Sequence, residues 1–176
     1  MAQNLFTQHC RQEADTTALA QKLAFSLSHL FQTTESAHLN ISLEGDLGAG
    51  KTTFARYLIQ AMGYKGRVKS PTYTLCEPYP VQIKSSDANH AICITAHHFD
   101  LYRMRDPLEW QEAGFAEHFD EPGFCLVEWP EKAEGTLPEF DIQIQLSSAE
   151  DENARNISLQ ASSDQGSAVV ETMYSQ

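Results

Sequence analysis

The sequence predicts a mixed α/β domain in which a mixed β-sheet is flanked by helices. Segments with apolar residues at helical spacing alternate along the chain with segments whose apolar residues recur at every second position. The 176 residues are enough for one domain with its own core and hardly enough for two. No internal repeat or low-complexity block indicates another architecture.

The first part of the chain is predicted to form a helix, a strand and a second helix. Asp15 and Thr16 are helix-capping residues, and leucines follow them at helical spacing. Alternating apolar and polar residues then indicate a strand that runs directly into a glycine-rich turn. The predicted bounds are 16–32 for the first helix, 38–45 for the strand and 51–62 for the second helix.

The second part of the chain is predicted to be richer in strands, because β-forming residues and alternating patterns dominate it. Periodicity is lost after residue 161, which predicts a flexible tail over 162–176. The other expected elements are an ordered loop around Pro71 with an extended segment after it, a hairpin tip over 83–90, a strand ending near Asp100, a helix capped by Asp106, a buried strand ending at Glu128, and two antiparallel strands at 140–146 and 156–161.

Composition limits the partners and the compartment. A net charge of -12 opposes direct binding of nucleic acid, so any RNA would have to be held by another protein. No apolar run approaches the roughly 20 residues that cross a bilayer, and the amino terminus has no secretory pattern, so we expect a cytoplasmic protein without a membrane partner. The 4 cysteines form no CxxC pair, which indicates neither a disulfide framework nor a zinc site.

The segment LEGDLGAGKTTF carries the strongest functional signal. From Gly45 to Thr52 it matches the pattern G-x-x-x-x-G-K-[ST], between a predicted strand and a predicted helix. The glycines, with Gly48 and Gly50, let backbone N–H groups converge on an anion at the start of a helix. Lys51 can then reach the β- and γ-phosphates, and the Thr52 hydroxyl can bind Mg²⁺. The segment therefore predicts a P-loop NTPase-like fold that holds a nucleoside triphosphate.

Such a site also needs an acidic residue at the end of a neighbouring strand to hold or orient Mg²⁺. Asp100 and Glu128 each follow an apolar strand, although either alone could be a solvated strand end. Which of the two contacts the metal directly is left open by the sequence. His97 and His98 are adjacent and point to opposite faces of a strand, which predicts structural or hydrogen-bonding roles and not a paired metal site.

Four segments in order, GDLGAGKTTF, VKSPTYTL, HFDLYR and LVEWPE, resemble the TsaE family, also called YjeE. These bacterial ATPases belong to the pathway that makes threonylcarbamoyladenosine in tRNA. The resemblance spans about residues 39–131, and several motifs in order make it far more specific than a P-loop alone. It implies a single P-loop ATPase domain over 1–161, slow ATP hydrolysis with Mg²⁺, and the TsaD and TsaB proteins as partners through which tRNA is reached.

The resemblance also implies roles for individual residues. Nucleotide contacts fall on Gly45, Gly48, Ala49, Gly50, Lys51, Thr52 and Thr53. Catalytic roles fall on Lys51, Asp100 and Glu128, metal binding falls on Thr52 and Glu128, and coupling of the nucleotide to a switch or partner falls on Ser70, Thr72 and Trp129. Arg155 is a weaker candidate for approach to the nucleotide.

Two other functions stay open at the level of sequence. A P-loop small-molecule kinase would use the same loop to hold its phosphate donor, although no acceptor pocket is apparent. A nucleotide-sensing adaptor would bind ATP and its partners without hydrolysis, because ordering a segment around the γ-phosphate can itself be the signal.

Overall fold

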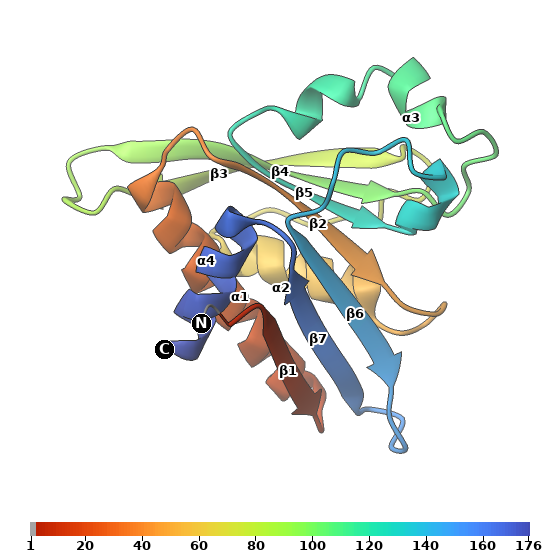
Figure 1. The fold of residues 1–176 in the computed structure, drawn as a ribbon, viewed down its shortest axis with the longest axis horizontal. Coiled ribbons are helices and arrows are strands. Elements are labelled where there is room, and N and C mark those ends of the chain that lie inside the picture. Colours follow the sequence, from red (N-terminus) through yellow and green to blue (C-terminus); the bar gives the residue numbers. More distant parts are fainter. Residues whose placement is uncertain (1–2) are drawn as a thin grey trace.

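The strands of the computed structural model, which describes residues 3–176, form one mixed sheet with the order β1-β7-β6-β2-β5-β4-β3 (Figure 1). β2 is parallel to both β5 and β6, and β4 is parallel to β5. β3, β7 and β1 add antiparallel pairs at the two sides, including the predicted β6–β7 pair. The expected mixed α/β architecture is confirmed. The strands are β1 (Leu5–Cys10), β2 (His38–Glu44), β3 (Cys76–Lys84), β4 (Ala91–Asp100), β5 (Gly123–Glu128), β6 (Ile142–Ser148) and β7 (Arg155–Ala161).

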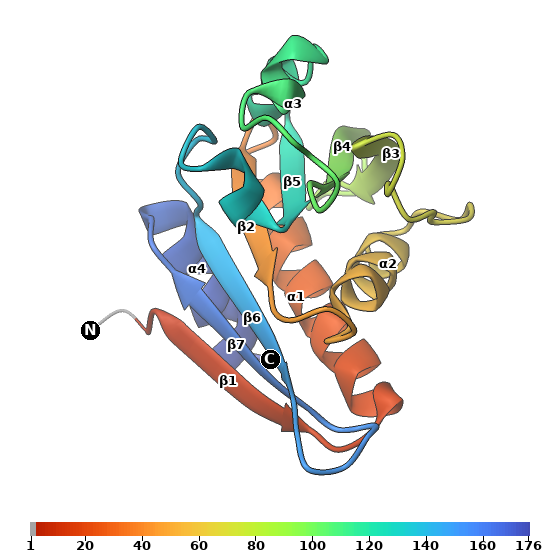
Figure 2. The same ribbon diagram turned by 90° about the vertical axis from the view of Figure 1, so that its right-hand side faces the viewer.

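Helices cover the two faces of the sheet unequally. On one face three longer helices enclose the main core, with α1 between α2 and α4 (Figure 2). On the other face short helical turns and loops enclose a smaller, aromatic-rich core around β4 and β5. The helices are α1 (Glu13–Thr33), α2 (Lys51–Ala61), α3 (Glu109–Glu112) and α4 (Asp164–Tyr174), with 3-10 turns η1 (Ala116–Phe119) and η2 (Pro130–Ala133).

Alternation along β4 divides its polar side chains between these two faces. Ile94 belongs to the main core, and His98 and Asp100 have the same phase, so they point to the face covered by α1 and α2. Phe99 belongs to the smaller core, and His97 shares its phase. The two adjacent histidines therefore serve opposite faces, as the sequence predicts.

The beginning of the chain differs from the prediction in two respects. Residues Leu5–Cys10 form the edge strand β1, which pairs with β7 and which the sequence does not predict. α1 begins at Glu13, before the predicted start at 16. The Asp15 carboxylate accepts hydrogen bonds from the backbone N–H groups of Arg11 and Gln12 at 3.0 and 3.3 Å, so Asp15 lies inside the first turn and reaches back to the cap.

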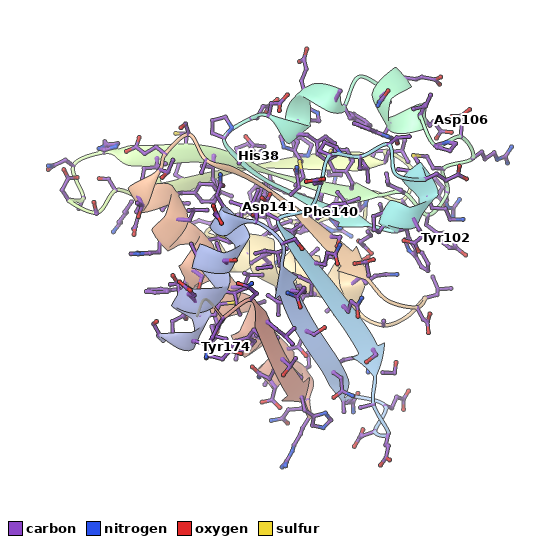
Figure 3. All side chains as sticks on the ribbon, viewed as in Figure 1. His38, Tyr102, Asp106, Phe140, Asp141 and Tyr174 are labelled. Carbon is purple, nitrogen blue, oxygen red and sulfur yellow. The ribbon has the colours of Figure 1, made fainter. Side chains whose placement is uncertain are left out.

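The prediction of a flexible tail over 162–176 is wrong, because most of that segment forms α4. The Ser163 hydroxyl accepts a hydrogen bond from the backbone N–H of Gly166 at 3.0 Å and caps the helix. At its other end the Tyr174 hydroxyl donates to the carbonyl of Leu5 at 2.6 Å (Figure 3). The helix buries Val169, Val170 and Met173 in the main core.

Asp141 joins α4 to the centre of the sheet (Figure 3). Its carboxylate accepts hydrogen bonds from the backbone N–H of Asn40 and from the Ser163 hydroxyl, both at 2.7 Å. A Cβ at Gly166 would lie 2.1 Å from the Asp141 carbonyl oxygen, so only glycine lets α4 approach this closely.

Two further expectations concern the connections. The hairpin tip predicted over 83–90 is confirmed, with Ser85 N–H bonded to the His90 carbonyl between β3 and β4. The helix predicted after Asp106 is reduced to the short α3, and the Asp106 side chain caps a turn at Leu108 N–H. None of the helices within residues 3–176 combines the length and apolarity that crossing a bilayer requires.

Candidate functional site

A glycine-rich loop, residues 45–50, connects the end of β2 to the start of α2. Gly45, Gly48 and Gly50 have φ values of 152°, 82° and 100°, a region that disfavours side chains. A Cβ at Gly45 would lie 2.4 Å from the carbonyl oxygen of Leu146 on β6. Glycine is therefore required where the loop passes β6 and where it enters the helix. The strand–loop–helix context on which the sequence motif depends is present.

Lys51 begins α2, and its side chain is buried under the loop with 5% exposure. The ammonium donates a hydrogen bond to the carbonyl of Gly45 and lies 3.3 Å from the centroid of the Trp129 ring, a cation–π contact. Burial lowers the pKa of Lys51, although nearby carboxylates, that of Glu128 foremost, favour the charged form. The lysine is thus held in place by the protein itself.

Glu128, at the end of β5, is the most enclosed carboxylate of the site, with 2% exposure. The Thr52 hydroxyl donates to it and lies 2.9 Å from both carboxylate oxygens. His98 Nε2 lies 2.6 Å from Oε2, and because a carboxylate only accepts, this nitrogen donates. Nδ1 of His98 is buried without a hydrogen-bond partner among residues 3–176. The hydrogen-bonding role predicted for His98 is confirmed.

Asp100 lies directly across from Glu128 in the parallel β4–β5 pair. Its carboxylate accepts a hydrogen bond from Tyr102 N–H at 3.0 Å. Burial raises the pKa of Asp100, and the neighbouring Glu128 charge raises it further. The two acidic residues predicted at strand ends are therefore neighbours, and both stand beside Lys51 and Thr52.

Trp129 follows Glu128 with a left-handed backbone, φ 57°, which is uncommon for a residue other than glycine. Its ring contacts Lys51, and its centroid lies 5.0 Å from that of Tyr102. The residue also packs against the smaller core. The structure confirms the packing role of Trp129 and places its ring against Lys51, and its functional role stays a prediction.

Ser70 and Thr72 are less directly placed than the other predicted residues. Their hydroxyls hydrogen-bond each other at 2.6 Å, and within the described part of the chain neither is bonded to the glycine-rich loop. A connection does run from the end of this segment to the acidic pair, because the Leu75 carbonyl accepts a hydrogen bond from Asp100 N–H at 3.0 Å. Next to Thr72, the Tyr73 ring is 84% exposed.

Two cavities border the glycine-rich loop. The larger, about 730 Å³, lies between the loop and β1, β6 and β7, and its wall includes Gly45 and Ala49. The smaller, about 200 Å³, is lined by Gly50, Thr53, Tyr57 and Arg155 among others. Arg155 Nε donates to the Ala49 carbonyl at 3.0 Å, which fixes the guanidinium against the loop. Tyr57, which the sequence analysis does not single out, also lines this cavity from α2.

Comparison with known proteins relates these features to a family. The family model described as "Threonylcarbamoyl adenosine biosynthesis protein TsaE" matches residues 10–157. A Haemophilus influenzae protein named "tRNA threonylcarbamoyladenosine biosynthesis protein TsaE" is 40% identical over 164 residues, 93% of this chain and 94% of that protein. The Bacillus subtilis protein of the same name is 38% identical over 112 residues, 64% of this chain and 63% of its own length.

The fold has a counterpart among solved structures. The crystal structure of Bacillus subtilis YdiB superimposes with a TM-score of 0.68 and 26% sequence identity, covering 97% of this chain and 95% of that chain. The match to the family model contains the glycine-rich loop and the ends of β4 and β5, where Lys51, Asp100 and Glu128 stand. By sequence along most of its length, the chain belongs to the TsaE family of threonylcarbamoyl adenosine biosynthesis proteins.

Proposed function

We propose that this protein binds Mg·ATP, hydrolyses it slowly, and supports the formation of threonylcarbamoyladenosine in tRNA together with TsaD and TsaB. The observation that carries the proposal is the contact of Thr52 with Glu128 at the start of α2, immediately beside the glycine-rich loop. A hydroxyl at a helix N-terminus next to such a loop, with a carboxylate at the end of a neighbouring strand, is the protein's share of a nucleotide–magnesium site.

The loop and α2 supply what a triphosphate needs. Backbone N–H groups at the N-terminus of α2 are free of helical partners and favour an anion. Gly48 leaves open space, since a Cβ there would have no atom within 4 Å, and phosphate oxygens can approach the backbone. Lys51 would exchange the Gly45 carbonyl for the phosphates. The two cavities on either side of the loop offer room for the nucleoside.

The oxygen atoms of Thr52 and Glu128 fit a magnesium ion. Mg²⁺ takes oxygen ligands at about 2.0–2.1 Å in an octahedron, so two adjacent ligands stand roughly 2.9 Å apart. The Thr52 hydroxyl and the Glu128 carboxylate already have a separation of 2.9 Å. The hydrogen bond from His98 keeps the carboxylate aimed at the hydroxyl. A bound Mg²⁺ would neutralise charge on the phosphates, and these residues would hold it.

Asp100 is assigned to the hydrolytic water and not to the metal. It stands beside Glu128, and its carboxylate is engaged by one backbone N–H, which leaves other lone pairs for a water molecule. Its raised pKa brings it closer to the range in which a carboxylate accepts a proton. Slow hydrolysis is expected because no arginine of the described chain contacts the Thr52–Glu128 pair to stabilise transferring charge.

Trp129 provides a physical route from nucleotide to partner. The ring contacts the Lys51 ammonium on one side and the half-exposed Tyr102 on the other. When Lys51 turns to a phosphate, the Trp129 ring loses its cation–π contact with the ammonium. The conformation of the surface around Trp129, and of the segment with Ser70 and Thr72, would then depend on the bound nucleotide. The net charge of -12 supports a protein partner, with tRNA reached through it.

The test combines nucleotide binding, turnover and tRNA modification. We expect calorimetry to detect Mg·ATP binding, and we expect phosphate release to be slow alone and faster with TsaD and TsaB plus tRNA. A phosphorylated small molecule among the products would instead identify a kinase, and binding without turnover under all conditions would identify an adaptor. If modification of tRNA continues over repeated rounds without this protein or its ATP, the proposed role is wrong.

A further inference from the structure

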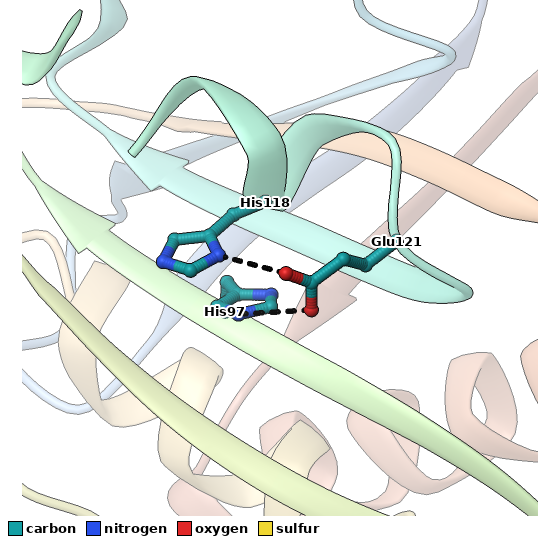
Figure 4. A group of neighbouring side chains, drawn as sticks. All are labelled: His97, His118 and Glu121. Carbon is teal, nitrogen blue, oxygen red and sulfur yellow. Dashed lines mark hydrogen bonds and ion pairs between the residues drawn. The ribbon is translucent and has the colours of Figure 1, made fainter. Parts of the chain in front are cut away.

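His97, His118 and Glu121 meet on the face of the sheet opposite to that covered by α1 and α2 (Figure 4). His97 comes from β4, His118 from η1, and Glu121 from the turn that leads into β5. They are three residues from separate elements, and none takes part in the proposed nucleotide site. One ligand atom from each lies within 4.8 Å of the others.

The carboxylate of Glu121 is the centre of this cluster. His118 Nδ1 lies 3.2 Å from Oε1, and His97 Nε2 lies 3.8 Å from Oε2. The two imidazole rings stack with centroids 4.0 Å apart and an interplanar angle of 17°. Both rings therefore present nitrogen atoms on the side where the carboxylate stands (Figure 4).

His97 has no other use for its ring nitrogens. Its side chain is 3% exposed, yet within residues 3–176 it makes no hydrogen bond, and the nearest charged group is Glu121 at 3.8 Å. Among the described residues only His98 Nδ1 is a fully buried side-chain nitrogen or oxygen without a partner, so the unbonded His97 ring nitrogens keep some contact with solvent and are open to a ligand. The ring is aimed at the space beside the carboxylate, where such a ligand would stand.

Contacts with two central strands hold the turn that carries His118 and Glu121. His38 Nδ1 lies 2.6 Å from the Glu121 carbonyl oxygen, and the Cys125 thiol donates to the His118 carbonyl at 3.3 Å. His38 and Cys125 belong to the central strands β2 and β5. The backbone of the turn is thus held on two sides, while the His118 and Glu121 side chains keep 26% and 44% exposure and access to solvent.

We propose that His97, His118 and Glu121 form a binding site for a divalent transition metal of the zinc type, with a fourth position open to water. Zinc binds imidazole nitrogen and carboxylate oxygen at about 2.0–2.2 Å, so ligand atoms in a tetrahedral site stand roughly 3.4 Å apart. The His118–Glu121 pair is already at 3.2 Å and the His97–Glu121 pair is at 3.8 Å, each through a different carboxylate oxygen. Metal binding would require the half-exposed carboxylate to rotate and the partly exposed His118 ring to turn out of its stack on His97, so that both lone pairs face one ion. Two nitrogen ligands select against Mg²⁺, which the other face of the sheet would hold.

The metal would act as a structural link. It would join η1 and the following turn to β4, and so hold the irregular connection 101–122 against the sheet. This site stands apart from the proposed nucleotide site, so each can fail while the other stands.

Calorimetry with ZnCl₂ on the chelator-treated full chain, without nucleotide or Mg²⁺, tests the proposal. We expect one equivalent to bind with a dissociation constant in the micromolar range or below, and the thermal midpoint to rise by several degrees at saturating Zn²⁺. Glu121→Gln keeps size and solvent exposure and should weaken binding at least tenfold. His97→Ala and His118→Ala should do the same, and Co²⁺ should give a visible absorption band that these variants lose.

Two control variants guard against adventitious binding. His90→Ala removes an exposed His–Glu pair, with Nε2 2.6 Å from Glu35 Oε1, for which residues 3–176 offer no third ligand. Cys93→Ser removes the exposed thiol. Both should bind Zn²⁺ like the parent, and Glu128→Gln should too. The proposal is overturned if no equivalent of Zn²⁺ binds, or if folded Glu121→Gln binds it as well as the parent does.

Discussion

Replacing Lys51 by methionine tests the nucleotide site while preserving most of the side-chain volume. In the proposed complex the ammonium makes two charge-assisted contacts to phosphates, each worth about 1.5–3 kcal/mol. To make them it gives up the hydrogen bond to Gly45 and the cation–π contact with Trp129. These internal contacts together amount to roughly 2–3 kcal/mol. The net loss in the variant is therefore about 1–3 kcal/mol, a 5- to 150-fold weaker affinity for Mg·ATP.

The fold should tolerate this change. Lys51→Met removes a buried cation whose pKa is lowered by burial, and the methionine stem still packs on the Trp129 ring. We expect the free energy of unfolding in urea to change by no more than about 1 kcal/mol. Lys65→Met, at an exposed position after α2, is the matched control and should leave affinity unchanged.

Titration calorimetry with ATP at saturating Mg²⁺ measures the affinity, and circular dichroism verifies that each variant is folded. A folded Lys51→Met protein that binds Mg·ATP within twofold of the parent would refute the assignment of this loop to phosphate.

Four other outcomes are expected. Glu128→Gln should remove the Mg²⁺ dependence of ATP affinity, whereas Asp100→Asn should reduce phosphate release more than ATP affinity. Titrating Mg²⁺ in both variants would show whether the two residues exchange these roles. If neither variant changes ATP affinity or phosphate release, the proposed site is wrong. Deleting 162–176 removes three buried apolar side chains of α4, each worth about 1.5–3 kcal/mol of stability. Since a typical domain has a free energy of unfolding of about 5–15 kcal/mol, the truncated protein should lose its cooperative thermal transition. An unchanged thermal transition would contradict the packing of α4 against the core. Burial, and next the nearby His118, lower the pKa of His97 from 6.5 to about 4, so as the pH falls the unfolded chain takes up this proton before the folded protein does. The metal-free protein should therefore lose free energy of unfolding as the pH falls from about 6.5 to 4. Urea unfolding at several pH values measures this slope, and His97→Gln should flatten it. Finally, a thiol reagent should titrate only Cys93 in the native protein and all 4 cysteines after unfolding, since the other thiols are buried; rapid reaction of a second thiol would contradict their burial.

Elements with uninterrupted periodicity were predictable from the sequence. α2, predicted over 51–62, spans Lys51–Ala61, because an amphipathic pattern follows directly on the glycine-rich loop. The proximity of Thr52 and Glu128 was also predictable, since parallel strands deliver their last residues to one edge of the sheet and the loop opens there. The pattern of residues thus contained the placement of the candidate site.

The misses have local physical reasons. β1 is an edge strand in which only Phe6 and Cys10 are buried, so its alternation is weak. In α4, Gly166 interrupts the helical signal for the sake of a close contact with Asp141, although Val169 and Met173 have helical spacing. The proximity of His118 and Glu121 to His97 could not be predicted from the sequence. It depends on the path of the irregular connection between β4 and β5, which no hydrophobic periodicity indicates.

If the glycine-rich loop holds phosphates as proposed, the internal partners of Lys51 would affect the rate at which it releases one ligand and takes the next. Because the ammonium already rests against the Gly45 carbonyl and the Trp129 ring, its water was removed when the chain folded, and an arriving anion meets a lysine that needs no further dehydration. The same contacts act in the opposite direction when the anion leaves, since the ammonium returns to partners within the protein and does not have to recruit solvent. In the proposed complex these contacts would return the lysine to its starting position after each departure, so Gly45 and Trp129 would shorten the residence of the spent ligand.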